Sequence, residues 1–496
     1  MPELYDELNK LAEGNMYPFH MPGHKRNSKS TQLQGAFRCD ITEIDGFDNL
    51  HDEKGIILRA EQRAARIYGS DETHFLVNGS TAGVLSSVSA LADEGDTVLA
   101  ARGSHRSLYH AAYLRNCSLN YLPIKIDRKY GIPQGYNSDA VENALDQMKI
   151  APKAVFITSP TYEGLCSDVE GISKLCHKRG IPLIVDAAHG AHFGTGSDMP
   201  KGAVEAGADV VIHSVHKTLP SMTQTALLHI NGSLVDREKI RRFTRIYQSS
   251  SPSYVLMASI DLCMEELEKR RDEFVSDMVR YRKMLSEASA KWRYISIPEI
   301  SKIPDPAKAL IYVEADKMTG QELYDILRDK YDLQLEMAGE RYALAIITGW
   351  DKEEGIIRLI DALGKIDTGI ADRENSFTGD GTCFNSLMKY EGSEVQSDTF
   401  AIPKTICSIK KAWDSDREYV LLDDAKGRVA GEFINLYPPG IPLIVPGELI
   451  NRDIIEKVNM YLNLGMNVQG VTDVGSSENN GIIRTDRRRI VCVRQK

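Results

Sequence analysis

Apolar and polar positions along the first half of the chain follow two alternating patterns. Short apolar runs ending in small or polar residues predict buried strands, and amphipathic stretches between them predict helices. The expected strands are residues 74–77, 97–100, 119–124, 154–158, 183–185 and 210–212, and the expected helices include 81–92, 104–114, 138–148 and 168–178. This alternation predicts an α/β fold, with a mainly parallel sheet covered by helices on both faces.

The rest of the pattern divides the chain into further segments. Residues 1–50 begin with a short amphipathic stretch and continue as a polar, irregular arm, and residues 51–290 form a large domain. This domain ends in a charged helix at 253–290 that is expected to link it to the next domain. Its charges are expected to form a solvated face. We then expect a small α+β domain at 291–367, a polar, glycine-rich linker at 368–400 and a C-terminal domain at 401–496.

Composition narrows the class of protein. The 496 residues are 42% hydrophobic and 26% charged with a net charge of −10, and no basic block indicates a nucleic-acid partner. No apolar run is long enough to span a membrane, and the N-terminus lacks a signal core. The eight cysteines are scattered without a Cys-x-x-Cys pair, so neither a metal site nor disulfides are expected. These features favour a cytoplasmic protein.

Three residue groups at predicted strand ends suggest chemistry. Lys217 closes Ser214-Val-His-Lys, just past the strand at 210–212. A partly desolvated lysine can lose its proton and condense with a carbonyl, although a surface lysine would have the same local sequence. Asp186 ends the strand at 183–185, where open α/β sheets bind ligands. Ser80, Thr81 and the backbone of Ala82 open a helix, whose N-terminus favours anions.

An anion site, a buried carboxylate and a strand-end lysine are together what pyridoxal 5′-phosphate requires. The helix N-terminus would hold the phosphate, Asp186 would keep the pyridine nitrogen protonated, and Lys217 would bind the aldehyde. Ser214 and His216 are expected to add donors from the other side. No Gly-x-Gly-x-x-Gly follows the first strand, which argues against a dinucleotide site.

Several motifs carry a resemblance to a known family. The chain resembles the ornithine/lysine/arginine decarboxylases, fold-type I pyridoxal-phosphate enzymes, in a short form without the N-terminal receiver-like domain. The matching stretches run in the family's order along nearly the whole chain, and the proline-rich C-terminal one is nearly diagnostic. They are Phe19-His-Met-Pro-Gly-His-Lys25, Asp40-Ile-Thr-Glu-Ile-Asp-Gly46, Val77-Asn-Gly-Ser-Thr-Ala-Gly83, Ser104-His-Arg-Ser-Leu108, Ser159-Pro-Thr-Tyr-Glu-Gly164, Asp186-Ala-Ala-His189, Ser214-Val-His-Lys217 and Tyr437-Pro-Pro-Gly-Ile-Pro-Leu-Ile-Val-Pro-Gly-Glu448.

The resemblance implies decarboxylation of arginine, lysine or ornithine to the amine and CO2, as in polyamine biosynthesis. It implies that His105 stacks on the cofactor ring, that Ala188 admits the opposite ring face, and that Glu448 lies near the substrate's distal cation. His189 is also expected to bind the cofactor, although the resemblance does not define its role. A core histidine and a surface glutamate are the alternative interpretations of His105 and Glu448. The resemblance also implies an obligate homodimer, or a higher even-numbered oligomer, with the site completed across a two-fold interface.

Two other functions remain open at this point. Another fold-type I reaction, by an aminotransferase or a C–C/β-elimination lyase, would use the same cofactor motifs, and the C-terminal proline-glycine-glutamate stretch argues against it. A non-catalytic homologue serving as an assembly partner would not need Lys217, Asp186 and His105 together. The sequence does not distinguish among the three basic substrates.

Overall fold

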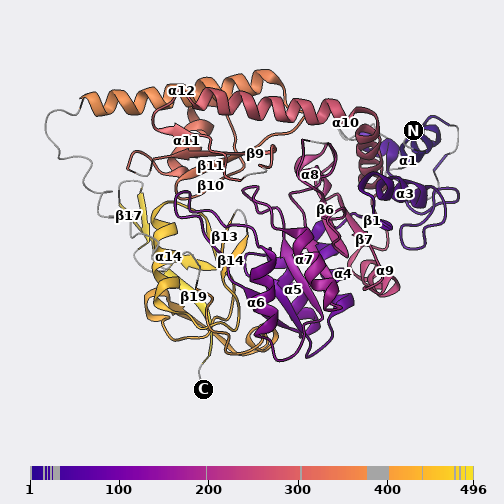
Figure 1. Cartoon of the computed structure of the whole chain (residues 1–496), viewed down its shortest axis with the longest axis horizontal. Coiled ribbons are helices and arrows are strands. Elements are labelled where there is room, and N and C mark those ends of the chain that lie inside the picture. The colour runs from indigo at the N-terminus through magenta and orange to yellow at the C-terminus, as the bar shows by residue number, and fades with distance from the viewer. Residues whose placement is uncertain are drawn as a thin grey trace.

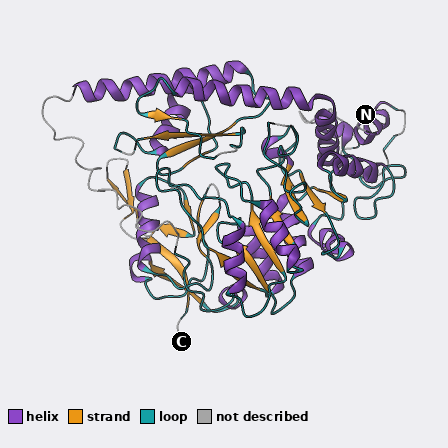
Figure 2. Cartoon of the chain, viewed as in Figure 1, coloured by secondary structure: helices purple, strands orange, loops and turns teal. Residues whose placement is uncertain are grey.

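The computed structural model describes residues 3–14, 17–18, 21–22, 25, 34–196, 198–301, 304–314, 316–376, 401–437, 440–473, 476–479, 482–485 and 488–494. Figure 1 shows the largest sheet with its helices at the centre and right, and the C-terminal elements at the lower left. The long helices α10 and α12 run along the top, above a smaller sheet, and Figure 2 shows the mixture of helices and strands in each part. The family motif at 19–25 falls largely outside the described residues.

The largest sheet has seven strands in the order β1-β7-β6-β5-β4-β2-β3. Four neighbouring pairs, from β3 through β6, are parallel, whereas β7 runs antiparallel to both β6 and β1. The expected mainly parallel α/β sheet is therefore confirmed. The strands are β1 (Glu72–Leu76), β2 (Thr97–Ala101), β3 (Ser118–Leu122), β4 (Ala154–Thr158), β5 (Leu183–Asp186), β6 (Val210–Ser214) and β7 (Ala226–Ile230).

Five of the described helices lie between successive strands of this sheet along the chain, and α9 follows β7 and packs on α4. They are α4 (Gly79–Leu91), α5 (Arg106–Arg115), α6 (Ser138–Asp146), α7 (Val169–Lys178), α8 (Val215–Thr218) and α9 (Arg237–Tyr247). Helix α4 lies against β6 and β7, and a Cβ at Gly83 would stand 2.7 Å from Leu76 and 3.0 Å from Ile212. Glycine at this position therefore allows the helix to approach the sheet closely, which places the N-terminus of α4 beside the end of β6.

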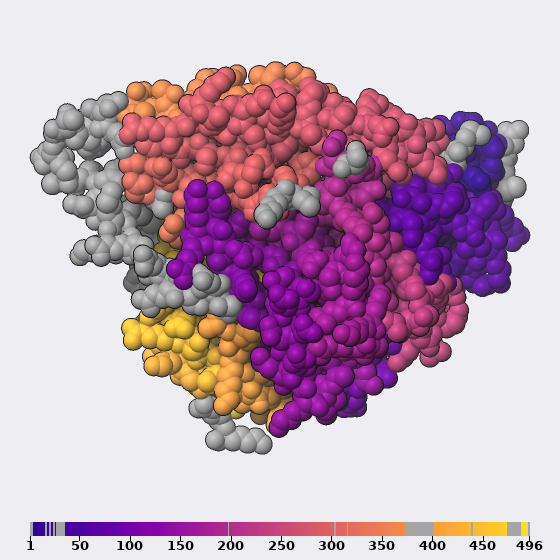
Figure 3. Space-filling model, in the orientation of Figure 1, coloured from indigo at the N-terminus to yellow at the C-terminus, as the bar shows by residue number. Residues whose placement is uncertain are grey.

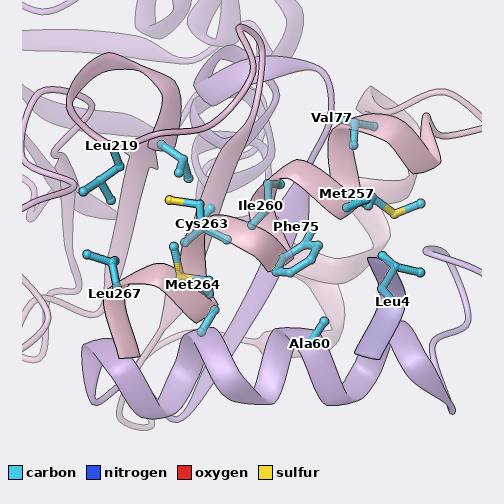
Figure 4. Close-up of a cluster of buried hydrophobic side chains, with 14 of the residues drawn as sticks. Leu4, Ala60, Phe75, Val77, Leu219, Met257, Ile260, Cys263, Met264 and Leu267 are labelled. Carbon is cyan, nitrogen blue, oxygen red and sulfur yellow. The ribbon is translucent and has the colours of Figure 1, made fainter. Parts of the chain in front are cut away.

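A second core joins the N-terminal residues to the large sheet. Helices α1 (Glu3–Glu13), α2 (Gln34–Cys39) and α3 (Ile56–Tyr68) contact the first half of α10 (Tyr254–Ser289). Leu4 and Leu8 are fully buried there, and Figure 4 shows Leu4 in one cluster with Phe75 and Met257. Burying each large apolar side chain contributes about 1.5–3 kcal/mol, so the short α1 is held by packing rather than by its own helical preference.

Helix α10 connects this core to a smaller sheet. It bends at Arg270, whose backbone is non-helical (φ −128°, ψ 23°), and its second half packs through Tyr281 and Leu285 on the smaller sheet. That sheet has the order β10-β11-β9-β8 and is antiparallel throughout. Its elements are β8 (Ile295–Ser296), β9 (Lys308–Val313), α11 (Gly320–Tyr331), β10 (Met337–Ala338), β11 (Tyr342–Ile346) and α12 (Glu353–Ser376).

The first part of the expected linker at 368–400 overlaps the end of helix α12. Helix α12 continues to Ser376, and residues 377–400 lie outside the described residues. Ile366 and Ile370, one helical turn apart, are both buried in the core of the smaller sheet. This apolar stripe extends the helix through residues whose polar composition alone suggests a linker.

The C-terminal residues form a further core with short sheets. The three-stranded sheets have the orders β12-β19-β16 and β14-β13-β15, and a two-stranded sheet pairs β17 with β18. The space-filling view shows these residues in yellow and orange at the lower left, beside purple residues of the large-sheet domain (Figure 3). Their elements are α13 (Ile409–Trp413), β12 (Arg417–Leu421), η1 (Leu422–Asp424), β13 (Ile434–Leu436), β14 (Ile441–Ile444), α14 (Arg452–Asn463), β15 (Val468–Gln469), β16 (Val471–Asp473), β17 (Ser476–Asn479), β18 (Ile482–Thr485) and β19 (Arg488–Val493).

No helix in the described part of the chain combines the length and apolar character needed to cross a bilayer.

Two buried histidines lie side by side on β6 and β7. His229 Nε2 is 3.0 Å from His213 Nδ1, and His229 Nδ1 is 2.8 Å from the Thr73 hydroxyl. Burial lowers the pKa of His213 to about 3 and that of His229 well below its usual value. Both rings are therefore neutral in the folded protein at neutral pH.

We expect acid to weaken the fold through these rings. Their stabilising contribution is complete above the unfolded pKa of about 6.5 and is lost as pH falls toward the folded values, at about 1.4 kcal/mol per pH unit for each ring. His213→Asn should therefore show a smaller drop in melting temperature between pH 7.5 and 5.5 than the unmodified protein. His51→Asn, outside this pair, serves as the control, and an equal drop in all three proteins would contradict the prediction.

Candidate active site

The expected site residues meet at one edge of the large sheet. Strands β4, β5 and β6 are parallel, with Thr158 opposite Asp186 and Asp186 opposite Ile212, so their carboxyl ends share an edge. Because β7 is antiparallel to both β6 and β1, β1 also ends at this edge and leads into α4. Four segments distant in sequence therefore deliver their polar residues to the same place.

Lys217 lies in the short helix α8, which follows β6 directly. Its Nζ is 2.8 Å from His189 Nε2 and 5.7 Å from the centre of the Tyr162 ring. Burial lowers the pKa of Lys217, and the nearby Lys308 acts in the same direction, whereas Asp186 and Glu336 oppose the shift. The amine is therefore easier to deprotonate than an exposed lysine, as nucleophilic attack on a carbonyl requires.

His189 is the hydrogen-bond partner of the Lys217 amine. Burial, reinforced by the charges of Lys217 and Lys308, lowers the pKa of His189 well below its usual range, so the ring is neutral. With Nε2 accepting from Lys217, the ring proton is on Nδ1, and this buried nitrogen has no hydrogen-bond partner among the described residues. The ring also lies against Tyr162, with centroids 4.2 Å apart.

Asp186 ends β5 as a buried carboxylate, 4% exposed. One oxygen accepts the Ala188 N–H at 3.1 Å. Burial raises the pKa of Asp186, while the charge of Lys217 and the Ala188 N–H oppose this shift. A buried carboxylate in this setting gains from a further cationic N–H partner, which a protonated pyridine nitrogen would supply.

The residues expected to bind an anion lie together at the start of α4 and the end of β6. Ser214 Oγ donates to Ser80 Oγ at 2.8 Å, which joins the end of β6 to the first turn of α4. Gly79 adopts φ +72°, the first turn carries no acidic residue, Thr81 is exposed, and Ala82 is buried. His216 lies beside this group, but its Nδ1 bonds the Thr225 carbonyl at 2.9 Å, so that nitrogen is committed to the backbone.

His105 caps the N-terminus of α5. The Ser107 N–H donates to His105 Nδ1 at 3.3 Å, so the ring proton belongs on Nε2. Burial, reinforced by the charge of Lys217, lowers the pKa of His105 to about 4. Its Nε2 edge faces Gly440, where a Cβ would stand 3.7–3.9 Å from the ring. Gly440 of the Tyr437–Glu448 motif therefore lies beside His105.

Glu448 lies in the protein interior. It is 1% exposed, its Oε2 is 3.0 Å from an Arg102 nitrogen and 2.8 Å from the Val445 N, and Arg102 is itself fully buried. Arg102 also donates to the carbonyls of Pro442 and Leu443. Glu448 thus fastens the end of β2 to the C-terminal residues, and its expected contact with a substrate's distal cation stays a prediction.

We expect Glu448→Gln to destabilise the protein strongly. The amide keeps the shape but removes the charge, which leaves the Arg102 guanidinium buried without its counter-ion, at a cost of about 3–5 kcal/mol. Thermal and urea unfolding would measure this loss. The double variant Arg102→Met with Glu448→Leu should recover part of the lost stability, because it buries no charge. Glu448→Gln with unchanged unfolding would contradict the prediction.

The sequence did not single out a buried network behind His189. Asp305 lies between His192 Nε2, at 2.7 Å, and Lys308 Nζ, at 3.4 Å, and all three side chains are almost completely buried. Burial tends to raise the pKa of Asp305, but Lys308 and His192 outweigh it and hold the pKa below its usual value. This network ties β9 to the loop after β5 and places the Lys308 cation near Lys217.

The arrangement of these residues in the structure suits pyridoxal phosphate. A helix N-terminus with three hydroxyls suits a phosphate, a buried carboxylate suits a protonated ring nitrogen, and a lysine with a lowered pKa suits an aldehyde. The buried His189 Nδ1 adds a donor that has no acceptor among the described residues.

Comparison with known proteins agrees with this chemistry. Residues 2–318 match the model of the Orn/Lys/Arg decarboxylase major domain, and residues 401–471 match that of its C-terminal domain. The chain is 32% identical to the uncharacterized protein YaaO of Bacillus subtilis over 94% of this chain and 95% of the other. It is 30% identical to an arginine decarboxylase of Halalkalibacterium halodurans over 95% of both chains. The crystal structure of a Francisella novicida lysine decarboxylase superposes with a TM-score of 0.80 at 18% identity, covering 100% of this chain and 81% of that one.

Proposed function

The chain belongs to the Orn/Lys/Arg decarboxylase family and decarboxylates a basic amino acid, and we propose that arginine is its substrate and agmatine its product. One observation best supports this reaction. Lys217, Asp186 and the N-terminus of α4 lie together at one edge of the large sheet. The choice of arginine is supported by relatives named arginine decarboxylase that match the chain over almost its whole length.

We propose that the cofactor is pyridoxal 5′-phosphate, as the family implies. Ser80, Thr81 and the Ala82 backbone would hold its phosphate with Ser214, Asp186 would pair with its ring nitrogen, and Lys217 would bind its aldehyde. His105, Ala188, His189 and His216 would line the ring and its surroundings. When bound, the cofactor supplies an electron sink for the pair left on the substrate Cα as CO2 departs.

Residues of the chain would transfer protons and exclude water during this reaction. Lys217 gives up its proton easily because it is partly buried near Lys308, and the neutral His189 can accept a hydrogen bond from it. His105 directs its Nε2–H away from Ser107, with Nδ1 committed to the helix cap. Burial of this edge limits water around the reacting carboxylate, which favours its release as neutral CO2.

A product assay tests the proposal. The purified protein with added pyridoxal phosphate is incubated separately with arginine, lysine and ornithine, and the products are identified by mass. We expect agmatine and CO2 from arginine, with the highest kcat/KM of the three substrates. A keto acid in place of CO2 would contradict the reaction, and a higher kcat/KM for lysine or ornithine would contradict arginine as the substrate.

We propose that the chain acts as a two-fold dimer or a multiple of it, in the cytoplasm. Dimers of this symmetry are the commonest homo-oligomers, and the seven described cysteines are free thiols, as a reducing compartment requires. We expect sedimentation velocity across a range of protein concentrations to show a dimer that carries all of the activity. An active monomer would contradict this prediction.

A further inference from the structure

A basic amino acid carries its cation at the far end of its side chain, so its recognition requires an anion within reach of Lys217. Asp186 and Glu336 are two carboxylates whose negative charges raise the pKa of Lys217 against the lowering effect of burial. Asp186 is buried and faces the expected cofactor, whereas Glu336 is exposed to solvent. Glu336 can therefore meet an incoming cation without first being moved from the interior.

Glu336 is held in place from two sides. It directly precedes β10, and its N–H donates to the Leu344 carbonyl at 2.9 Å, which ties it to β11. The Tyr162 hydroxyl donates to one oxygen of its carboxylate. The Tyr162 ring in turn lies 5.7 Å from Lys217 Nζ and packs on His189. Tyr162 thus spans the interval between the Lys217 amine and the Glu336 carboxylate.

The other glutamates near this edge already have partners. Glu448 is buried in its ion pair with Arg102, and Glu163 is buried and accepts the Tyr342 hydroxyl at 2.9 Å. Across the described part of the chain, Glu336 forms no ion pair, and Tyr162 occupies one of its two oxygens. Its negative charge is therefore available to a cation from outside the chain.

We propose that Glu336 is a specificity-determining residue that binds the cationic end of the substrate side chain, with Tyr162 as its positioning residue. This inference rests on the proposed function, in which the substrate's α-amino group reacts where Lys217 lies. The apolar stem of arginine or lysine would then lie along the Tyr162 ring, and its guanidinium or ammonium would meet the carboxylate at the far side. A carboxylate already fixed by one hydrogen bond pays less entropy when it binds a second donor.

The test is Glu336→Gln, with Glu314→Gln as the matched control. Glu314 is an exposed glutamate that follows β9 in the same small sheet. We expect Glu336→Gln to raise KM for arginine about tenfold with little change in kcat, the scale of a partly exposed charge pair. Inhibition by citrulline, which has the same shape without the charge, should be unchanged. Glu314→Gln should leave all of these constants unchanged. Tyr162→Phe should raise KM by a smaller factor than Glu336→Gln.

Calorimetric binding of agmatine provides a readout that does not depend on turnover. Agmatine should bind Glu336→Gln about tenfold more weakly than the unmodified protein. If the unmodified protein binds agmatine through Glu336 but releases no CO2 from arginine, the proposed reaction fails while the assignment of Glu336 stands. Equal agmatine affinity and equal KM in Glu336→Gln and Glu314→Gln would overturn the assignment.

Discussion

Lys217→Ala is expected to abolish decarboxylation and to remove the visible absorbance of bound cofactor from the purified protein. Lys217 is the one lysine at the shared edge of β4, β5 and β6 whose amine contacts His189, within the described residues. Loss of an amine that bonds covalently and moves protons should lower the turnover rate by roughly 10³- to 10⁴-fold. Absorption spectra and a CO2-release assay on the same preparation would measure both effects.

Two further variants separate the chemistry of the amine from its charge. Lys217→Arg keeps the positive charge, but a guanidinium remains protonated and cannot attack a carbonyl, so this variant should be as inactive as Lys217→Ala. Lys201→Ala removes an exposed lysine that pairs with Glu170 at 2.9 Å, and it should behave like the unmodified protein. Retained absorbance and turnover in Lys217→Ala would show that another residue does the work assigned to Lys217.

Strand positions could be predicted well because the central strands are short apolar runs with polar ends. Strand β7 (Ala226–Ile230) was not among the predicted strands, although its five residues are all buried. We expected a helix between successive strands, whereas β7 returns antiparallel to β6 after only α8 and a short loop. Antiparallel neighbours need no crossover helix, so the alternation used to find the other strands does not apply here.

The site residues could be predicted where each lies at a strand end. Lys217, Asp186 and Ser80 follow strands that share one sheet edge, so their sequence positions alone imply proximity. Lys308 lies in β9 of the smaller sheet and Glu336 directly precedes β10, and no local sequence pattern connects either residue to Lys217. They reach it through the packing of two sheets joined by α10, which residue spacing does not reveal. Tyr162 lies in the family motif Ser159–Gly164, so the sequence did contain a signal for this residue.

Asp186→Asn is expected to fold and to lose most of its activity. Its side chain retains an oxygen that can accept the Ala188 N–H, so the local structure should persist. In the proposed complex with pyridoxal phosphate, a neutral amide would not hold a proton on the pyridine nitrogen, and the cofactor would lose its electron sink. Because this interaction acts mainly in the transition state, kcat should fall by roughly 10²- to 10⁴-fold, with a much smaller change in KM. Steady-state kinetics and the absorbance of bound cofactor would test both statements.

Asp209→Asn is the matched control for this variant. Asp209 is equally buried, 2% exposed, but it lies at the opposite edge of the sheet, where it accepts the Leu183 N–H at 2.8 Å and contacts His177 at 2.9 Å. Its replacement should lower the melting temperature and leave kcat close to that of the unmodified protein. If Asp186→Asn kept a near-normal kcat, or if both variants lost activity in proportion to lost stability, Asp186 would be a structural carboxylate. The combination of a stable Asp186→Asn with low kcat and a less stable Asp209→Asn with normal kcat is the result that the geometry of the sheet predicts.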